Sequence, residues 1–298
     1  RIKPLIAARP GYINPVMLAK MIATFDQLTQ GRICINLIAG QSEAEILSDG
    51  ITYKKEDRYA LMDEEVDIMK AIWAEGGPID FDGRFHKLQG AKIVPQIHQR
   101  PYPPFYLGGG SEEAARLSAK HSDVHLFWGD TREQIAKNIA HIRDLADEHG
   151  RRDEIGFGMR LQICCRETAD EAWAVARELV AAGTDRSRNR IRQDTARSAA
   201  NTRVQELAEQ GEMIGPALWT GITKVLSLIH ISEPTVRAGA GIAVVGNPEQ
   251  CAAQLQEFID AGCHSFCLSG YLHDEEAGRF HDMVRPLLAS RNQERMAA

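Results

Sequence analysis

The sequence predicts an α/β protein built around a parallel sheet, and two observations lead to that prediction. First, six short apolar runs each lead directly into a cluster of glycine, aromatic or charged residues. Second, helical patterns lie between most of the runs, and buried strands that alternate with amphipathic helices form parallel sheets. The runs are Leu5–Ala8, Ile33–Ile38, Phe105–Leu107, Val124–Phe127, Phe157–Cys165 and Ser265–Leu268. Because parallel strands bring their carboxyl ends to one edge, the pattern predicts an enzyme whose site is spread over many strand ends.

Local signals predict the helices between these runs. Asn14 and Pro15 supply a cap and a first position for a helix that reaches about residue 28, and Gly31 ends it. Its apolar positions are Met17, Leu18, Met21, Ile22, Phe25 and Leu28. Further helices are expected at about 58–74, 111–121, 131–149, 168–182, 248–261 and 274–288, with a capping box at 131–134 and another strand at 241–246.

Two segments break the alternation. Residues 76–104 are expected to form a hairpin, with its turn at Asp82-Gly83, followed by an extended proline-rich insertion. Residues 184–224 contain many arginines and no predicted strand, which is typical of a lid-like insertion.

The composition excludes several classes of function. The chain has 298 residues, 44% of them hydrophobic and 26% charged, which allows one large barrel or two smaller domains. A net charge of −6 argues against a nucleic-acid surface, which needs a concentrated basic face. No apolar stretch approaches the roughly 20 residues that span a bilayer, so we expect a cytoplasmic protein. The chain begins at Arg1, close to a strand, which suggests that an N-terminal segment is missing.

The six cysteines are interpreted as buried, reduced thiols of a cytosolic protein, because none forms a CxxC pair. No set of histidine, cysteine and carboxylate residues has the spacing of a metal site. His86, His98, His121 and His281 are therefore interpreted as structural or surface residues.

Three motifs are candidates for a functional site, and each also has a structural explanation. The run Gly108–Ser111 lies between a strand and a helix, where it forms either a phosphate-binding turn or a simple tight turn. Trp128 at a strand end offers a flat face for a ring system, or it packs in the core. Arg160 interrupts an apolar strand, so its guanidinium either pairs with a carboxylate or holds an anionic substrate group.

Residues near these motifs extend the candidate set. Gln162 shares a strand face with Arg160, because successive strand residues point to opposite sides. Tyr271 and His273 follow the last strand, and the tyrosine either donates a proton to an oxygen intermediate or is an ordinary loop residue.

A dispersed, ordered set of motifs resembles the luciferase-like flavin monooxygenases, most closely the two-component alkanesulfonate monooxygenases. The resemblance covers nearly the whole chain and rests on Ala8–Pro10, Asp26–Leu28 with Gly31-Arg32, Asp57–Tyr59, Arg100–Pro104, Gly108–Ser111, Trp128-Gly129, Arg160-Leu161, Arg166–Thr168 with Asp170–Trp173, Leu218-Trp219, Gly239–Gly241 and Leu268–Tyr271. It implies a (β/α)8 TIM barrel as a single domain over residues 1–298. The first two strands would be missing, so that the six runs become strands three to eight.

The resemblance also implies a function. Reduced FMN would come from a separate NAD(P)H-dependent FMN reductase, and O2 would be used to split an alkanesulfonate into an aldehyde and sulfite. Trp128, Arg160, Arg237 and Tyr271 would line the site, with Gly109, Gly110 and Ser111 at the FMN phosphate, Gly40 at the cofactor, and Gln162 and His273 beside the substrate. The enzyme is expected to be a homo-oligomer, a dimer or a tetramer.

The chain departs from the family pattern at three places. The two missing strands would carry a histidine and a cysteine of the site. Gln162 replaces a histidine and has no proton to shuttle near neutral pH, which leaves open a substrate other than a simple alkanesulfonate. Deleting 226–236 (LSLIHISEPTV) restores the family pattern, so we interpret these eleven residues as translated sequencing-adapter sequence, an assembly artefact.

Two alternatives to desulfonation remain. One is a luciferase-like monooxygenase that acts on a sulfone or another small molecule. The other is an inactive partial barrel, in which open sheet edges favour aggregation.

Overall fold

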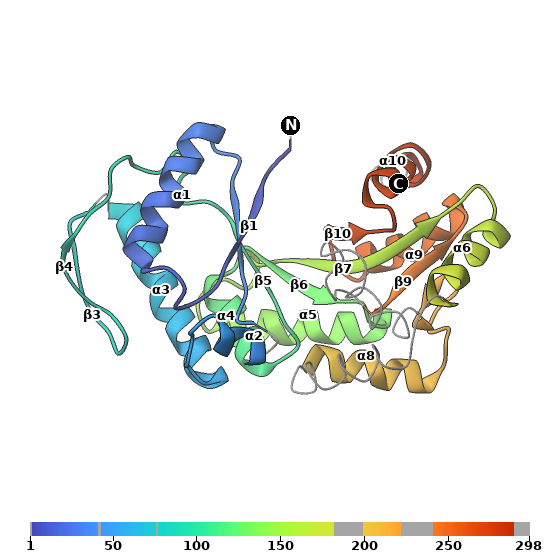
Figure 1. The fold of residues 1–298 in the computed structure, drawn as a ribbon, viewed down its shortest axis with the longest axis horizontal. Helices are drawn as coiled ribbons and strands as arrows, with labels where there is room; N and C mark the ends of the chain where they lie inside the picture. The colour runs from blue at the N-terminus through green and yellow to red at the C-terminus, as the bar shows by residue number, and fades with distance from the viewer. Residues whose placement is uncertain (1, 41–42, 76, 182–198, 222–240, 289–298) are drawn as a thin grey trace. The chain divides into compact units, whose positions relative to one another are not determined.

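The computed structural model describes residues 2–40, 43–75, 77–181, 199–221 and 241–288 (Figure 1). They form α/β structure in two compact units, residues 1–125 with 142–155, and residues 126–141 with 156–298. All six apolar runs form strands, with ends within one residue of the predicted ones.

The first unit contains three parallel strands. β1 (Leu5–Ala8) pairs with β2 (Cys34–Leu37), and β2 pairs with β5 (Phe105–Gly108). Ile35 in the middle strand lies opposite Ile6 on one side and Phe105 on the other. The helices of this unit are α1 (Pro15–Thr29), α2 (Glu43–Ser48), α3 (Lys55–Glu75) and α4 (Glu112–His121).

Helix α1 begins as its sequence predicts. The Asn14 side chain accepts hydrogen bonds from the backbone N–H groups of Val16 at 3.0 Å and Met17 at 3.4 Å. Pro15, at the first position, has no N–H that needs a partner. The helix ends at Gln30, which has a left-handed backbone with φ 56°, and not at Gly31 itself.

The predicted apolar face of α1 is only partly correct. Leu18 and Ile22 are buried with Ala19 and Ala23, but the other four predicted members are exposed. These are Met17, Met21, Phe25 and Leu28, with exposed fractions of 50%, 53%, 43% and 76%. The smaller residues face the core because they let α1 approach it closely.

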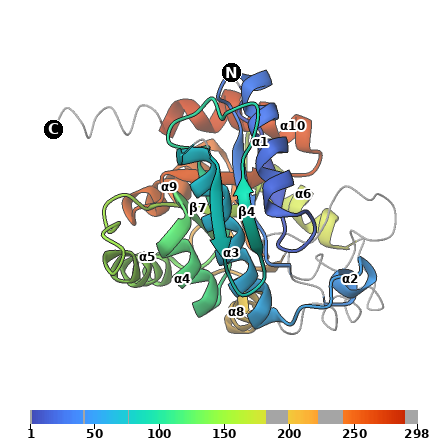
Figure 2. The ribbon, with the colours of Figure 1, turned by 90° about the vertical axis from the view of Figure 1, so that its left-hand side faces the viewer.

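The predicted hairpin is present in the first unit. β3 (Ile79–Asp82) pairs antiparallel with β4 (Lys87–Ala91), and Figure 2 shows the hairpin beside α3. The turn is longer than the predicted Asp82-Gly83, because the Gly83 N–H donates to the His86 carbonyl at 2.9 Å. The Glu64 carboxylate accepts from the backbone N–H groups of Phe85 and His86, which ties the turn to α3.

The second unit is organised around the ten-residue strand β7 (Gly156–Cys165). Its first half pairs in parallel with β10 (Ser265–Ser269), and its second half pairs in parallel with β9 (Ala243–Gly246). β6 (Val124–Trp128) neighbours β7 in the sheet order, and the short β8 (Leu218–Trp219) pairs antiparallel with β9. β8 corrects the prediction that residues 184–224 contain no strand.

The helices of the second unit lie close to their predicted positions, with one addition. They are α5 (Arg132–Asp147), of which residues 142–147 belong to the first unit, α6 (Ala169–Ala181), α8 (Ala199–Gln210), α9 (Pro248–Asp260) and α10 (His273–Arg279), the last continuing as a π-helical turn over Phe280–Val284. The capping box at the start of α5 is half correct. The Thr131 hydroxyl accepts from the Gln134 N–H at 3.3 Å, but the Thr131 N–H donates to Asp130.

The sequence did not predict α8 within the proposed lid. Among the described residues, no helix is long and apolar enough to cross a membrane.

Candidate functional site

Three neighbouring strands of the second unit share one half-buried face. Arg160 of β7 lies in register with Cys267 of β10, and Gln162 lies in register with Ser269. Because strand residues alternate between faces, these four side chains lie on the same side of the sheet. All four residues are half-buried, whereas Leu161 between Arg160 and Gln162 is fully buried. The two predicted substrate residues of β7 are therefore brought together.

The opposite face of the same strands is an apolar core. Phe157 of β7 stacks on Phe127 of β6, with ring centroids 5.8 Å apart. Met159, Leu161 and Ile163 continue this buried face along β7. The polar side chains of β7 are therefore confined to one face, as the alternation of burial requires.

Trp128 lies on the polar face of β6. A side chain at Gly158 would meet Leu126, which places Leu126 on the Arg160 face, and alternation then places Trp128 there too. The indole is half-buried, and its N–H donates to no other described residue. A Cβ at Gly129 would lie 2.7 Å from Leu161 and 2.8 Å from Ile242, so only glycine fits directly after this tryptophan.

Arg160 has no carboxylate partner among the described residues. One guanidinium nitrogen, Nη1, donates to the Cys267 sulfur at 3.6 Å, and the buried Nε has no partner within the described part of the chain. An unpaired buried donor on a cation is costly. Of the two explanations for Arg160, pairing with a carboxylate therefore finds no support in the described structure.

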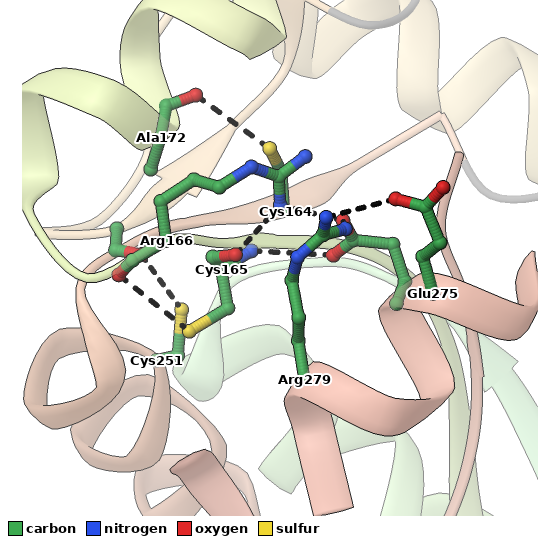
Figure 3. Close-up of polar contacts among 9 residues, drawn as sticks. Cys164, Cys165, Arg166, Ala172, Cys251, Glu275 and Arg279 are labelled. Atoms are coloured by element: carbon green, nitrogen blue, oxygen red, sulfur yellow. Dashed lines mark hydrogen bonds and ion pairs between the residues drawn. The ribbon is translucent and has the colours of Figure 1, made fainter. Parts of the chain in front are cut away.

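The buried carboxylate of Glu276, which follows β10, is bound by two arginines other than Arg160. Figure 3 shows these two arginines, Arg166 and Arg279, together with Cys165 and Glu275. Glu276 lies 2.5 Å from Arg166 and 2.7 Å from Arg279, and it accepts the Cys165 N–H at 3.4 Å. Its side chain is only 2% exposed. This network joins the end of β7 to α10 and leaves Arg160 outside it.

The proposed lid is attached close to Trp128. Arg203 of α8 donates two hydrogen bonds to Asp130, at 2.7 and 3.0 Å, and this buried carboxylate lies two residues beyond Trp128. A bidentate arginine–carboxylate pair fixes orientation as well as distance. Helix α8 is therefore held at the carboxyl end of β6.

Tyr271 and His273 lie beyond the end of β10. Tyr271 is 52% exposed, and His273 is an exposed residue at the start of α10. Neither makes a hydrogen bond to Arg160 or Gln162. Their proposed proton-donating and substrate-binding roles stay predictions. Arg237 and the segment 226–236 lie outside the described residues.

The predicted phosphate turn belongs to the first unit. Ser111 is the N-cap of α4, and its hydroxyl accepts the Ala114 N–H at 3.3 Å. A Cβ at Gly109 would lie 2.7 Å from the Cβ of Ala114, so the turn is packed closely on the helix. Glu113 accepts bonds at this helix start, from its own N–H and from Ser111, which lowers the pKa of its carboxyl. The exposed Glu113 side chain therefore places a negative charge near the helix start where a phosphate would bind.

Gly40, the other predicted cofactor residue, follows β2. Its backbone has φ 90°, and a Cβ there would lie 2.5 Å from the Cδ1 of Ile46. Glycine is required by this conformation and by the close approach of α2. The structure supplies a packing reason for Gly40, and its contact with a cofactor stays a prediction.

One cluster with possible metal ligands was not predicted. Asp63, Asp67 and His121 bring one ligand atom each within 4.8 Å of one another. The Lys120 ammonium lies 2.7 Å from Asp63 and 2.9 Å from Asp67, so this position already holds a cation. No local pattern in the sequence indicates this cluster, because the acidic residues and His121 come from α3 and α4, far apart in the chain.

All six cysteines are free, and five are buried as predicted. Cys267 differs, because it is half-buried on the Arg160 face. Cys267 and Ser269 are therefore the residues of this face that sequence reasoning missed. The signal for them was the alternation of small polar residues, Ser265, Cys267 and Ser269, along one strand.

Comparison with known proteins shows which family and which solved structures the chain resembles. A family model described as luciferase-like monooxygenase matches residues 1–265. A riboflavin lyase (RcaE), solved with modified FMN and riboflavin, superposes with a TM-score of 0.75 and 19% identity over 97% of this chain and 70% of its own. The EDTA monooxygenase EmoA from Chelativorans sp. BNC1 superposes with a TM-score of 0.71 and 19% identity, over 98% of this chain and 75% of its own. A coenzyme F420-dependent tetrahydromethanopterin reductase from Methanopyrus kandleri superposes with a TM-score of 0.66 and 19% identity, over 97% of this chain and 84% of its own. At these identities the likeness concerns the fold, which is the α/β fold of the luciferase-like TIM-barrel type.

Proposed function

The chain belongs to the luciferase-like monooxygenase family, and from that premise we propose that it uses reduced FMN and O2 to convert an alkanesulfonate into an aldehyde and sulfite. One observation carries the substrate class. Arg160 presents a half-buried guanidinium with no carboxylate partner among the described residues, on a face shared with Trp128 and Gln162. A cation in this environment is stabilised by an anion, which the substrate supplies.

The proposed reaction balances in atoms and electrons. The carbon–sulfur bond and one C–H bond of the same carbon break: sulfite leaves with the carbon–sulfur electron pair, and the hydrogen is lost as a proton. One oxygen atom of O2 enters the aldehyde, and the other leaves as water. Reduced FMN, when bound, supplies the two electrons and the site at which O2 is activated.

The residues of the chain would hold the reactants. Arg160 binds the sulfonate, and the Gln162 amide donates a further hydrogen bond. Trp128 supplies a flat wall that keeps water from the reacting carbon. Tyr271 donates a proton to the departing oxygen, and Arg237 and His273 complete the substrate contacts.

The fit of FMN to these residues is uneven. Trp128, whose indole N–H donates to no other described residue, suits the ring system, whereas the Gly109–Ser111 turn has the exposed Glu113 side chain at the start of its helix. A phosphate at this turn requires Glu113 to move aside. The riboflavin lyase, solved with modified FMN, supports FMN as the cofactor, whereas the coenzyme F420-dependent reductase makes F420 the competing candidate.

We also propose two kinds of protein partner. A separate NAD(P)H-dependent FMN reductase supplies the reduced flavin. A second copy of the chain covers the exposed apolar side chains Met17, Met21, Phe25 and Leu28 of α1, which form one stripe along the helix. Light scattering after chromatography tests this: the stripe predicts a dimer or tetramer, and Phe25→Glu should shift it towards the monomer.

The experiment that tests the reaction is sulfite release. A panel of sulfonates is incubated with the chain, FMN, NAD(P)H and an added FMN reductase, and the chain without residues 226–236 is run in parallel. Arg160→Met should lower kcat/KM by about 10- to 100-fold, the loss expected for a hydrogen bond to a charged group. The kcat/KM of Arg160→Lys should lie between that of the wild type and that of Arg160→Met, because lysine keeps the positive charge but not the planar guanidinium.

The result also separates the alternatives. No sulfite from any sulfonate, together with oxidation of a sulfone, favours the sulfone monooxygenase and overturns desulfonation. The EDTA monooxygenase, whose named substrate carries carboxylates, makes a carboxylated panel the second comparison.

A further inference from the structure

Two polar atoms on the Arg160 face are buried and have no partner in the described part of the chain. They are the Nε of Arg160 on β7 and the Oγ of Ser269 on β10. Each carries a hydrogen that it can donate, and a buried donor without an acceptor costs roughly 1–3 kcal/mol. Two such donors on neighbouring strands would both be satisfied by one acceptor group that the described residues do not supply.

The register places the two donors at a useful separation. Arg160 lies opposite Cys267 and Gln162 lies opposite Ser269, so Arg160 and Ser269 lie on the diagonal of one pleat. With strands about 4.8 Å apart and alternate residues about 6.6 Å apart, the diagonal is about 8 Å. Both side chains project from the same face of the sheet, so a group with several oxygen atoms lying across this diagonal would face both donors.

The side chains opposite the two donors on β7 and β10 are small or polar. Cys267 and Ser269 are small, whereas Leu126 and Ser265 fill the space over Gly158, one pleat before Arg160. The Cys267 sulfur takes only one guanidinium nitrogen of Arg160, at 3.6 Å. The Gln162 amide, beside Ser269, makes no hydrogen bond to another described residue.

Ser269 itself is held in place by the structure that follows it. A Cβ at Gly270 would lie 2.4 Å from the Glu276 Cγ and 2.9 Å from the Ile163 carbonyl oxygen, so the strand end is closely packed. The Glu276 carboxylate is bound by Arg166 and Arg279, and it is therefore not an acceptor for Ser269 or Arg160.

We propose that Ser269 is a substrate-binding residue: its hydroxyl and the Nε–H of Arg160 each donate to a different oxygen of the substrate's sulfonate group. This inference rests on the proposed function and deepens it, because it names the atoms that bind the anion. A sulfonate has three oxygens, so the third faces the Gln162 amide. A sulfone places two oxygens on a neutral group and gains far less from the guanidinium.

The test is binding of hexanesulfonate to the full chain, measured by calorimetry with and without saturating FMN. Ser269→Ala should weaken binding by about tenfold, the loss of one hydrogen bond to a charged group. Ser269→Thr keeps the hydroxyl and should restore most of the affinity. Ser265→Ala is the matched control, because Ser265 lies on the same face of β10 but opposite Gly158, away from Arg160.

Thermal melts of the three serine variants should coincide with that of the wild type, which separates binding from folding. A double-mutant cycle with Arg160→Met should show coupling between the two donors, because they hold the same group. Wild-type affinity in Ser269→Ala, or an equal loss in Ser265→Ala, would overturn the role of Ser269 while the proposed function stands. No binding of hexanesulfonate to the wild type under either condition would overturn both.

Discussion

Replacing Glu276 with glutamine tests whether a buried ion network holds the end of β10 against β7. Glutamine keeps the size of the side chain and removes its charge. The carboxylate is 2% exposed and lies 2.5 Å from Arg166 and 2.7 Å from Arg279. Removing it leaves two guanidinium groups without their buried counter-charge.

The expected loss follows from the burial of the partners. Removing one partner of a fully buried ion pair costs about 3–5 kcal/mol. The side chains of Arg166 and Arg279 are 16% and 31% exposed, so water compensates in part for the lost carboxylate. We therefore expect Glu276→Gln to lower the free energy of unfolding by ~3 kcal/mol, the lower end of that range.

Glu275→Gln is the matched control. Glu275 also binds Arg279, at 2.8 Å, but its side chain is 51% exposed, so its loss should cost less than about 1 kcal/mol. The measurement is urea unfolding followed by tryptophan fluorescence and circular dichroism, with the change in midpoint converted through a common slope. Equal losses for the two variants, or a loss below about 1 kcal/mol for Glu276→Gln, would refute the argument from burial.

Three further predictions follow from the geometry. Glu113→Gln should raise the affinity for FMN relative to riboflavin about two- to fivefold in a fluorescence titration, because a carboxylate no longer occupies the start of α4. Unchanged selectivity would place the phosphate elsewhere. Burial raises the pKa of Glu65 to about 7 from 4.5, so between these pH values the folded chain keeps a proton that the unfolded chain has released. Stability due to Glu65 should therefore fall as pH rises through that window, and Glu65→Gln should flatten the fall in urea midpoints measured from pH 5 to 8. Cys267 should react with iodoacetamide before the five buried cysteines, as read by mass spectrometry, and hexanesulfonate should slow that reaction. Faster labelling of any other cysteine would contradict the assigned face.

The strands could be predicted from the sequence because their signal is local. Each apolar run is short and ends at a turn residue, and burial in a parallel sheet needs no information from elsewhere in the chain. The face of α1 could not be predicted in the same way. Its sequence offers two adjacent stripes, and the one that contains Ala19 and Ala23 faces the core, while the larger Met17 and Met21 stay exposed. Hydrophobicity alone favours the larger side chains, whereas close packing favours the smaller ones.

In the candidate site too, the residues set by a local pattern could be predicted, whereas those set by contacts between distant segments could not. The alternation of strand residues was enough to place Arg160 and Gln162 on one face. It was not enough to find Cys267 and Ser269, because their position depends on the register between strands more than 100 residues apart. The Asp63, Lys120 and His121 cluster was missed for the same reason, since α3 and α4 meet only in the folded chain.

The length of β7 explains how a strand interior tolerates a cation. Gln162 marks a change of neighbour, because it pairs with Ser269 at the end of β10 and with Ala243 at the start of β9. Before this point, the residues opposite β7 on the polar face are Ser265 and Cys267, whose side chains are small. After it, Ile163, Cys164 and Cys165 pair with the buried strand β9 and are themselves buried. An arginine at position 164, on the same face, would meet a closed core, because Cys164 is buried. The change of partner at Gln162 therefore confines the cation, which has no carboxylate partner among the described residues, to the less buried half of β7.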